Sequence, residues 1–295
     1  MQQVVLDFSA MGGPCEIRLY AENKAEGHEI ALSAKQEILR LATKYSRYQQ
    51  DTITSRINQL AGTHEKFKVD DETSALLTFA DTCFKQSDGL FDITSGVLRR
   101  VWDFKKNHLP TQQAVEDLLP LIGWQKIQWN SPYIQLPVVG MEIDFGGFVK
   151  EYAADAAANI CINSGIKHGL INLAGDIHVI GPHPDGSGWR IGIRHPRQPD
   201  QAITTIECHH GALASSGDYE RFILVDNKRY SHILNPRTGW PENELASVSI
   251  VADQCIVAGA SATIAILKGK AGIQWLNELS LKYYCIDWQG KVFNM

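Results

Sequence analysis

Residues 141–165 read MEIDFGGFVKEYAADAAANICINSG, and the sequence pattern changes twice within this stretch. The alternation over 141–144 predicts a strand, and Gly146-Gly147 marks a turn after it. The alanine-rich segment 148–163 predicts a helix, which Gly165 closes. The stretch therefore predicts a strand, a double-glycine turn and a helix in succession.

On either side of this unit, the predicted strands and helices come in blocks. Alternation of apolar and polar residues predicts the strands, and apolar residues every three to four positions predict the helices. The predicted strands are 2–8, 14–20, 126–129, 133–137, 169–173, 177–180, 188–194, 203–208, 221–226, 229–233, 246–252, 282–287 and 291–294; the predicted helices are 24–45, 72–86, a short one capped by Thr111 and ended by Pro120, 257–267 and 271–278. Such blocks favour an α+β fold with mixed β-sheets over a doubly wound sheet.

The composition is that of a globular protein. The chain has 295 residues, of which 44% are hydrophobic and 21% charged, which excludes a disordered chain, a coiled coil and a collagen-like repeat. Lys and Arg number 28 against 33 Asp and Glu, a net charge of −5. A nucleic-acid-binding protein would show a basic surface, so no nucleic-acid partner is expected.

Cysteine spacing and the N-terminal sequence indicate the cellular compartment in which the protein is expected. The six cysteines include no CxxC pair, so they are expected to be reduced core residues and not zinc ligands. The N-terminus, MQQVVLDFSAMGG, lacks the features of a signal peptide, and no apolar stretch approaches ~18 residues. A cytoplasmic location and no membrane span are expected, with export if the chain is a processed form.

The polar segment 103–112 is the predicted linker.

Five segments combine residue types that bind ligands, and each also has a structural interpretation. They are 87–96, which contains Phe91 and Asp92, 141–150, 172–177, 214–221 and 230–241. The double glycine in 141–150 would let the backbone approach a ligand, and the helix start would offer N–H groups to an anion. A tight turn without a ligand has the same sequence pattern. His232 titrates near neutral pH and could carry a proton, although a lone histidine in an apolar strand is more often structural.

Taken together and in this order, four segments resemble the ApbE family, the FAD:protein FMN transferases. They are DFGG…K at 144–150, NLAGD at 172–176, SSGDYER at 215–221 and HILNPRTGWP at 232–241. The resemblance implies an α+β fold and one domain over 1–295, made of two closely packed subdomains at about 1–105 and 106–295. It also implies an enzyme that cleaves FAD with the help of Mg²⁺. That enzyme would attach FMN through its phosphate to a Thr or Ser of a target flavoprotein and release AMP.

The resemblance assigns roles to individual residues. The FAD contacts that it implies are Met11, Tyr48, Leu90, Phe91, Asp92, Asp144, Lys150 and Ile233. The metal-binding positions that it implies are Gly147 and Ala262, through backbone oxygens, and Thr263. Aromatic and thioether side chains would cover the rings, and Lys150 would face the phosphates. His232 is the candidate proton acceptor.

The sequence departs from the family pattern at two positions. Ala174 replaces a glycine of the third motif, and Gly259 stands where relatives carry the Asp that ligates Mg²⁺. Mg²⁺ sites in proteins usually contain at least one carboxylate, so weaker metal binding is expected unless Asp144 or Asp253 fills the gap. The departure keeps two alternatives open, an FAD-binding protein without transfer activity and an FAD pyrophosphatase.

Overall fold

A computed structural model describes residues 1–106 and 108–295 of the chain. The predicted linker, 103–112, includes Asn107, which lies outside the described residues. Within the part of the chain that is described, no helix is long and apolar enough to cross a membrane. All six cysteines are buried and free, as predicted.

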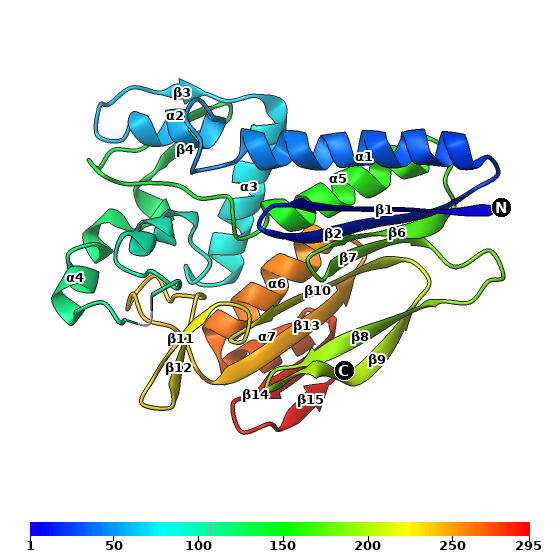
Figure 1. The fold of residues 1–295 in the computed structure, drawn as a ribbon. Helices are drawn as coiled ribbons and strands as arrows, with labels where there is room; N and C mark the ends of the chain where they lie inside the picture. Colours follow the sequence, from blue (N-terminus) through cyan, green and yellow to red (C-terminus); the bar gives the residue numbers. More distant parts are fainter. Residues whose placement is uncertain (107) are drawn as a thin grey trace.

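The centre of the fold is an eight-stranded antiparallel sheet (Figure 1). In order across the sheet, its strands are β1 (Gln2–Ala10), β2 (Gly13–Ala21), β6 (His168–Leu173), β7 (Asp176–Gly181), β10 (Gly211–Gly217), β13 (Leu245–Ala252), β14 (Lys282–Asp287) and β15 (Val292–Asn294). The first two strands thus join strands from the second half of the chain, and one sheet spans both halves. The division into subdomains near residue 105 stays a prediction.

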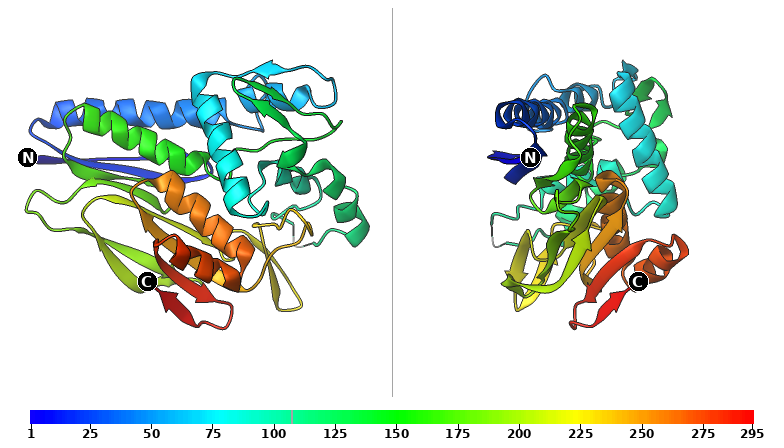
Figure 2. Two further views of the ribbon diagram at one scale, coloured as in Figure 1. Left: turned by 180° about the vertical axis from the view of Figure 1, so that it is seen from behind. Right: turned by 90° about the vertical axis from the view of Figure 1, so that its right-hand side faces the viewer.

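Four helices cover one face of this sheet, and a hairpin covers the other (Figures 1 and 2). The helices are α1 (Lys24–Lys44), α5 (Val149–Asn163), α6 (Cys255–Lys268) and α7 (Lys270–Glu278); the hairpin is β8 (Trp189–His195) and β9 (Gln198–Cys208). Side chains alternate across each strand, so Ile171 faces the helices while its neighbour Leu170 packs against the hairpin.

The remaining elements pack at one end of the helical layer (Figure 1). They are α2 (Ile53–Gln59), α3 (Asp71–Gln86), α4 (Gln112–Glu116), the 3₁₀ helices η1 (Ile93–Arg100), η2 (Leu119–Leu121) and η3 (Trp124–Lys126), a three-stranded sheet of β3 (Phe67–Lys68), β5 (Tyr133–Gln135) and β4 (Gln128–Asn130), and the hairpin β11 (Phe222–Val225) and β12 (Lys228–Ser231). A separate apolar cluster around Trp102 joins η1, α4 and β11.

The α+β prediction is confirmed. The predicted mixing of parallel and antiparallel strands is wrong, because every strand pair of the described residues is antiparallel. The predicted strand at 141–144 is also wrong. This segment lies outside the strands of the described residues. Its polar backbone groups are satisfied in other ways: the Asn58 side chain bonds both the N–H and the carbonyl of Ile143, and the Asp144 N–H donates to the Ile93 carbonyl at 2.8 Å. A side chain thus takes the place of a neighbouring strand, which alternation alone cannot reveal.

Other boundaries also differ from the prediction. The sequence pattern does not predict strand β10, because its sequence, GALASSG, is rich in small residues that are not typical of strands. His232 lies just after β12 and not inside a strand. The helix that Thr111 caps ends at Glu116, before Pro120.

Candidate active site

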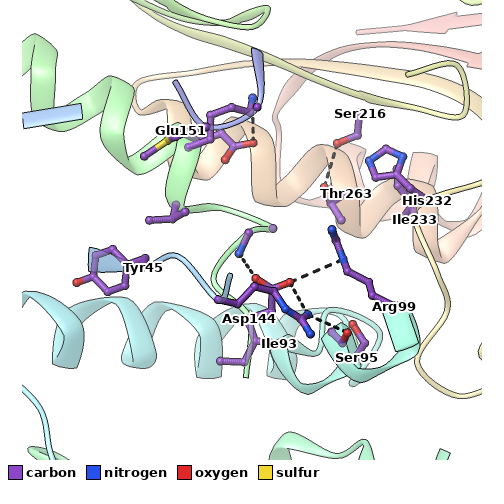
Figure 3. A pocket seen from close by; sticks show the side chains of 18 of the residues that line it. Tyr45, Ile93, Ser95, Arg99, Asp144, Glu151, Ser216, His232, Ile233 and Thr263 are labelled. Atoms are coloured by element: carbon purple, nitrogen blue, oxygen red, sulfur yellow. Dashed lines mark hydrogen bonds and ion pairs between the residues drawn. The ribbon is translucent and has the colours of Figure 1, made fainter. Parts of the chain in front are cut away.

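One cavity of about 720 Å³ gathers most of the predicted site residues (Figure 3). Its volume is typical of small-molecule sites, ~300–1,000 Å³. The predicted residues that line it are Met11, Tyr48, Leu90, Phe91, Asp92, Asp144, Gly147, Lys150, His232, Ile233 and Thr263. Gly259 and Ala262 are buried in α6 and are not among the lining residues described. The structure brings eleven predicted residues to one place, and their roles stay proposals.

The turn between β1 and β2 carries Met11 to the cavity. Ala10 pairs with Gly13, which leaves Met11 and Gly12 as a two-residue turn with φ of 50° and 85°. Residues other than glycine rarely adopt positive φ, and such conformations are concentrated at functional sites. A Cβ atom on Gly12 would lie 3.1 Å from Nη2 of Arg221, so this turn packs directly against a basic group of the cavity.

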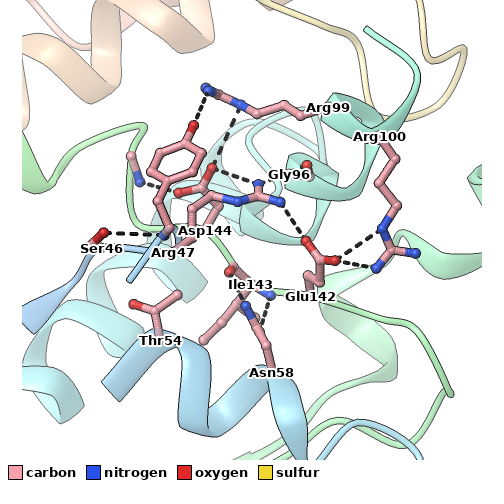
Figure 4. Close-up of polar contacts among 12 residues, drawn as sticks. Ser46, Arg47, Thr54, Asn58, Gly96, Arg99, Arg100, Glu142, Ile143 and Asp144 are labelled. Carbon is pink, nitrogen blue, oxygen red and sulfur yellow. Dashed lines mark hydrogen bonds and ion pairs between the residues drawn. The ribbon is translucent and has the colours of Figure 1, made fainter. Parts of the chain in front are cut away.

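Two arginines surround Asp144 (Figure 4). Its Oδ2 accepts from Arg47 Nη1 at 3.1 Å and lies 3.8 Å from Arg99 Nε, while Oδ1 accepts from the Gly146 N–H at 2.8 Å. The Tyr48 hydroxyl, on a side chain that is 79% exposed at the rim, accepts from Arg99 Nη1 at 3.1 Å. Neither Arg47 nor Arg99 could be predicted as a site residue from the sequence, because isolated arginines form no motif.

Lys150 connects helix α5 to the turn between β6 and β7. Its ammonium group pairs with the Asp176 carboxylate and lies 3.4 Å from the Leu173 carbonyl oxygen. Asp176 in turn accepts from the Ser215 N–H of β10 at 3.1 Å. Lys150 therefore faces the cavity with one carboxylate already beside it.

Asp92 is buried and hydrogen-bonded within the protein. Its Oδ1 accepts from the N–H and the hydroxyl of Thr94, and its Oδ2 accepts from the Trp124 N–H at 2.9 Å. Burial raises the pKa of Asp92, against the lowering effect of these hydrogen bonds. At the cavity wall, Asp92 holds the start of η1 and η3 in place.

His232 offers a neutral imidazole to the cavity. Its Nδ1 lies 3.3 Å from the Arg221 carbonyl oxygen, which can only accept, so the geometry assigns the hydrogen to Nδ1 and a lone pair to Nε2. Burial, together with the positive charges of Arg221 and Arg99, lowers the pKa of His232 to about 4. The ring is therefore uncharged at neutral pH and can accept a proton.

The α6 side of the cavity holds a hydroxyl pair and a buried acid (Figure 3). The Ser216 and Thr263 hydroxyls are 2.9 Å apart. Glu151 is 9% exposed, and burial raises its pKa, opposed by the charge of Lys150. Among the residues described, no group of three or more His, Cys, Asp and Glu side chains is arranged to hold a metal ion. Any metal here would therefore draw on hydroxyl, carbonyl or ligand oxygens as well.

The arrangement suits a ligand with ring systems and phosphate groups. Met11, Leu90, Phe91 and Ile233 supply apolar surface, while Lys150, Arg99 and Arg221 supply positive charge. The neutral His232 adds a proton acceptor at the same cavity.

The model of the ApbE family matches residues 11–285. An FAD:protein FMN transferase of Klebsiella pneumoniae (strain 342) is 30% identical over 257 residues, which cover 84% of this chain and 77% of the relative. An FAD:protein FMN transferase of Vibrio cholerae is 28% identical and covers 76% of this chain and 69% of the relative.

The crystal structure of an ApbE protein from Thermotoga maritima superimposes with a TM-score of 0.91 at 29% identity, covering 99% of this chain and 97% of that one. The family match extends over nearly the whole described fold and includes every segment that lines the cavity. This chain belongs to the ApbE family.

Proposed function

We propose that this protein is an FAD:protein FMN transferase, which moves FMN from FAD onto a hydroxyl group of a protein acceptor. The observation that carries the proposal is the cavity itself, in which apolar walls, basic side chains and a neutral imidazole meet. Relatives that are 28% and 30% identical carry this activity in their names.

FAD has two ring systems joined through a pyrophosphate, and the cavity lining includes both apolar and basic side chains that suit these parts. The family resemblance assigns Met11 and Tyr48 to the flavin side, and Leu90, Phe91 and Asp92 to the adenine side. All five residues line the cavity. Lys150 faces the pyrophosphate between them, where a charge-assisted hydrogen bond to phosphate oxygen is favourable. Asp144, held by Arg47, lines the same cavity.

In the transfer, the acceptor hydroxyl oxygen attacks the phosphorus on the FMN side of the pyrophosphate. A new P–O bond forms, the bond to the bridging oxygen breaks, and AMP leaves with that electron pair. His232 accepts the hydroxyl proton at Nε2, because Nδ1 is engaged with the Arg221 carbonyl. Lys150 and Arg221 stabilise the negative charge on the phosphates as the bond breaks.

Magnesium is part of the proposal. When bound at the pyrophosphate, Mg²⁺ would neutralise its charge and orient it. The residues fit such an ion: Thr263 offers a hydroxyl at the cavity, the backbone carbonyls of Gly147 and Ala262 are candidate ligands, and a buried carboxylate oxygen of Glu151 lacks a hydrogen-bond partner among the described residues.

The acceptor is proposed to be a flavoprotein with a reactive Thr or Ser. The test is incubation of the protein with FAD, Mg²⁺ and a purified protein that carries phosphate-linked FMN on a threonine in its mature form, prepared without flavin. We expect AMP and a covalently fluorescent acceptor in equal amounts. AMP and free FMN without labelled acceptor would instead indicate a pyrophosphatase, and intact FAD would indicate a binding protein without transfer activity.

A further inference from the structure

Gly259 lies one turn into α6, directly against the side chain of Glu151 from α5. A Cβ atom on Gly259 would lie 2.5 Å from Glu151 Cγ and 2.9 Å from both Cδ and Oε1. Real Cβ atoms do not approach other atoms so closely, so Glu151 fills the space that a side chain at position 259 would need.

The contact between the two helices explains why Glu151 reaches this place. Asp155, one turn further along α5, accepts from the Cys255 N–H at 2.7 Å and the Ile256 N–H at 2.9 Å, and thereby caps α6. One turn from Asp155 leads back to Glu151, and one turn from Cys255 leads on to Gly259. The cap therefore sets the register in which Glu151 lies over the glycine.

The Glu151 carboxylate is buried without adequate partners. Its Oε2 has no hydrogen-bond partner among the described residues, and Oε1 lies 3.8 Å from the Lys150 ammonium, which already pairs with Asp176. The residue is only 9% exposed. An unsatisfied buried acid is costly, and a bound ion is one of the partners that such a group takes in native proteins.

A hydroxyl and the ligand phosphates complete the set of oxygens. Thr263 follows Gly259 by one helical turn and thus shares its face of α6, and both Thr263 and Glu151 line the cavity. Figure 3 shows them against the ribbon of α6, across the cavity from Asp144. Hard divalent cations such as Mg²⁺ take carboxylate, hydroxyl and phosphate oxygens together.

We infer that Glu151 supplies the carboxylate ligand of a divalent cation at this cavity, from α5, in place of the aspartate that is absent at position 259. The inference rests on the proposed function, because the phosphates of FAD provide the remaining oxygens. The other acids named from the sequence are less suited: Asp144 is held by Arg47, and Asp253 is exposed and outside the described cavity lining.

The test measures Mn²⁺ binding to the FAD-saturated protein, with free Mn²⁺ followed by electron paramagnetic resonance. The variants are Glu151→Gln, Gly259→Asp and the exchange Glu151→Gly/Gly259→Asp; Asp253→Asn is the matched control. FAD affinity is measured separately without metal, and the thermal unfolding midpoint shows whether each variant folds.

Glu151→Gln is expected to weaken Mn²⁺ binding about tenfold or more, while metal-free FAD binding is retained. Gly259→Asp alone should not increase the Mn²⁺ affinity. It should lower the thermal unfolding midpoint, because the added side chain meets Glu151. The exchange should restore Mn²⁺ binding to within about threefold of the unmodified protein, since the carboxylate returns to the same space. Asp253→Asn should leave the Mn²⁺ affinity, the FAD affinity and the unfolding midpoint unchanged.

Equal Mn²⁺ affinity of the Glu151→Gln variant and the unmodified protein would overturn the inference. If that variant does not fold, the exchange decides, and a folded exchange variant without Mn²⁺ binding overturns it as well. Failure to bind FAD would contradict the proposed function, whereas FAD binding with metal affinity independent of Glu151 contradicts only this inference.

Discussion

His232 is the residue on which the proposed proton transfer depends. His232→Gln keeps a polar side chain of similar size but removes the proton acceptor, so transfer should slow about 10²–10⁴-fold. FAD affinity should change little, because the imidazole is neutral. Single-turnover AMP release and calorimetric FAD titration measure the two effects. A transfer rate within about threefold of the unmodified protein would mean that another group accepts the proton.

The low pKa of His232 also predicts a pH dependence of stability. Its folded-state pKa of about 4 is below the ordinary value of 6.5, so the unfolded chain binds this proton first as the pH falls. The free energy of unfolding should therefore decrease between pH 6.5 and 4, by about 2 kcal/mol from this half-buried group. Urea unfolding at several pH values measures this dependence. The free energy of unfolding of His232→Gln should change less with pH than that of the unmodified protein, and an identical change would contradict the assignment.

Lys150 is expected to contribute directly to FAD binding. Lys150→Ala removes a charge-assisted hydrogen bond to phosphate, so the binding free energy should weaken by about 1.5–3 kcal/mol. Calorimetric titration measures it, with Lys24→Ala, at an exposed position at the start of α1, as the control. An unchanged dissociation constant would mean that Lys150 serves only its ion pair with Asp176.

At the residue scale, the motif positions could be predicted from the sequence and their partners could not. Met11, Asp144 and Lys150 lie in recognisable segments, and all three line the cavity. Arg99 and Glu151 act through neighbours that are distant in sequence or lie on another helix. Such contacts depend on packing, which a single sequence does not display.

Among the elements, the contact between α5 and α6 determines the geometry of the proposed metal site. Asp155 is buried, accepts two N–H groups of α6 and also contacts His178 Nδ1 at 2.6 Å. Asp155→Asn removes the charge from these bonds and should lower the free energy of unfolding by about 2–3 kcal/mol. Denaturant unfolding checks this, with the exposed Asp253→Asn as control; equal stability of both variants would contradict the capping role.

The departure at Ala174 lies in the turn between β6 and β7, at a position with positive φ. Leu173 pairs with Asp176, and Ala174 and Gly175 between them have φ of 54° and 98°. Glycine adopts such angles without steric cost, so Ala174→Gly should stabilise the protein by about 0.5–1 kcal/mol. Gly175→Ala should destabilise it. Thermal unfolding of both variants tests this, and a loss of stability in Ala174→Gly would show that the alanine methyl contributes packing.

Elements with a strong repeating pattern were predicted well, and elements held by tertiary contacts were not. Helix α1 occupies Lys24–Lys44, close to the predicted 24–45, because its apolar face has a clear helical spacing. Strand β10 consists of small residues and exists because β7 and β13 flank it. The extended segment at 141–144 alternates like a strand, yet Asn58 takes the bonds of a partner strand.

For the molecule as a whole, the antiparallel sheet brings distant parts of the chain to one cavity. Met11 comes from the first hairpin, Lys150 from the centre of the chain and Thr263 from α6 near its end, and all line the same space. The α+β class could be predicted from the blocks of strands and helices. The strand order, with β1 and β2 beside β6, could not be predicted, because pairing between distant strands leaves no local pattern in the sequence.

The central claim is that this one cavity holds a complete FAD molecule, with apolar contacts at its two ends and Lys150 at the phosphates between them. Calorimetric titration of the protein with FAD, FMN and riboflavin tests this claim most directly. FAD should bind most tightly, because only FAD reaches both the Met11 and Phe91 ends, and riboflavin most weakly, because it lacks phosphate. Equal affinity for riboflavin and FAD would contradict the account.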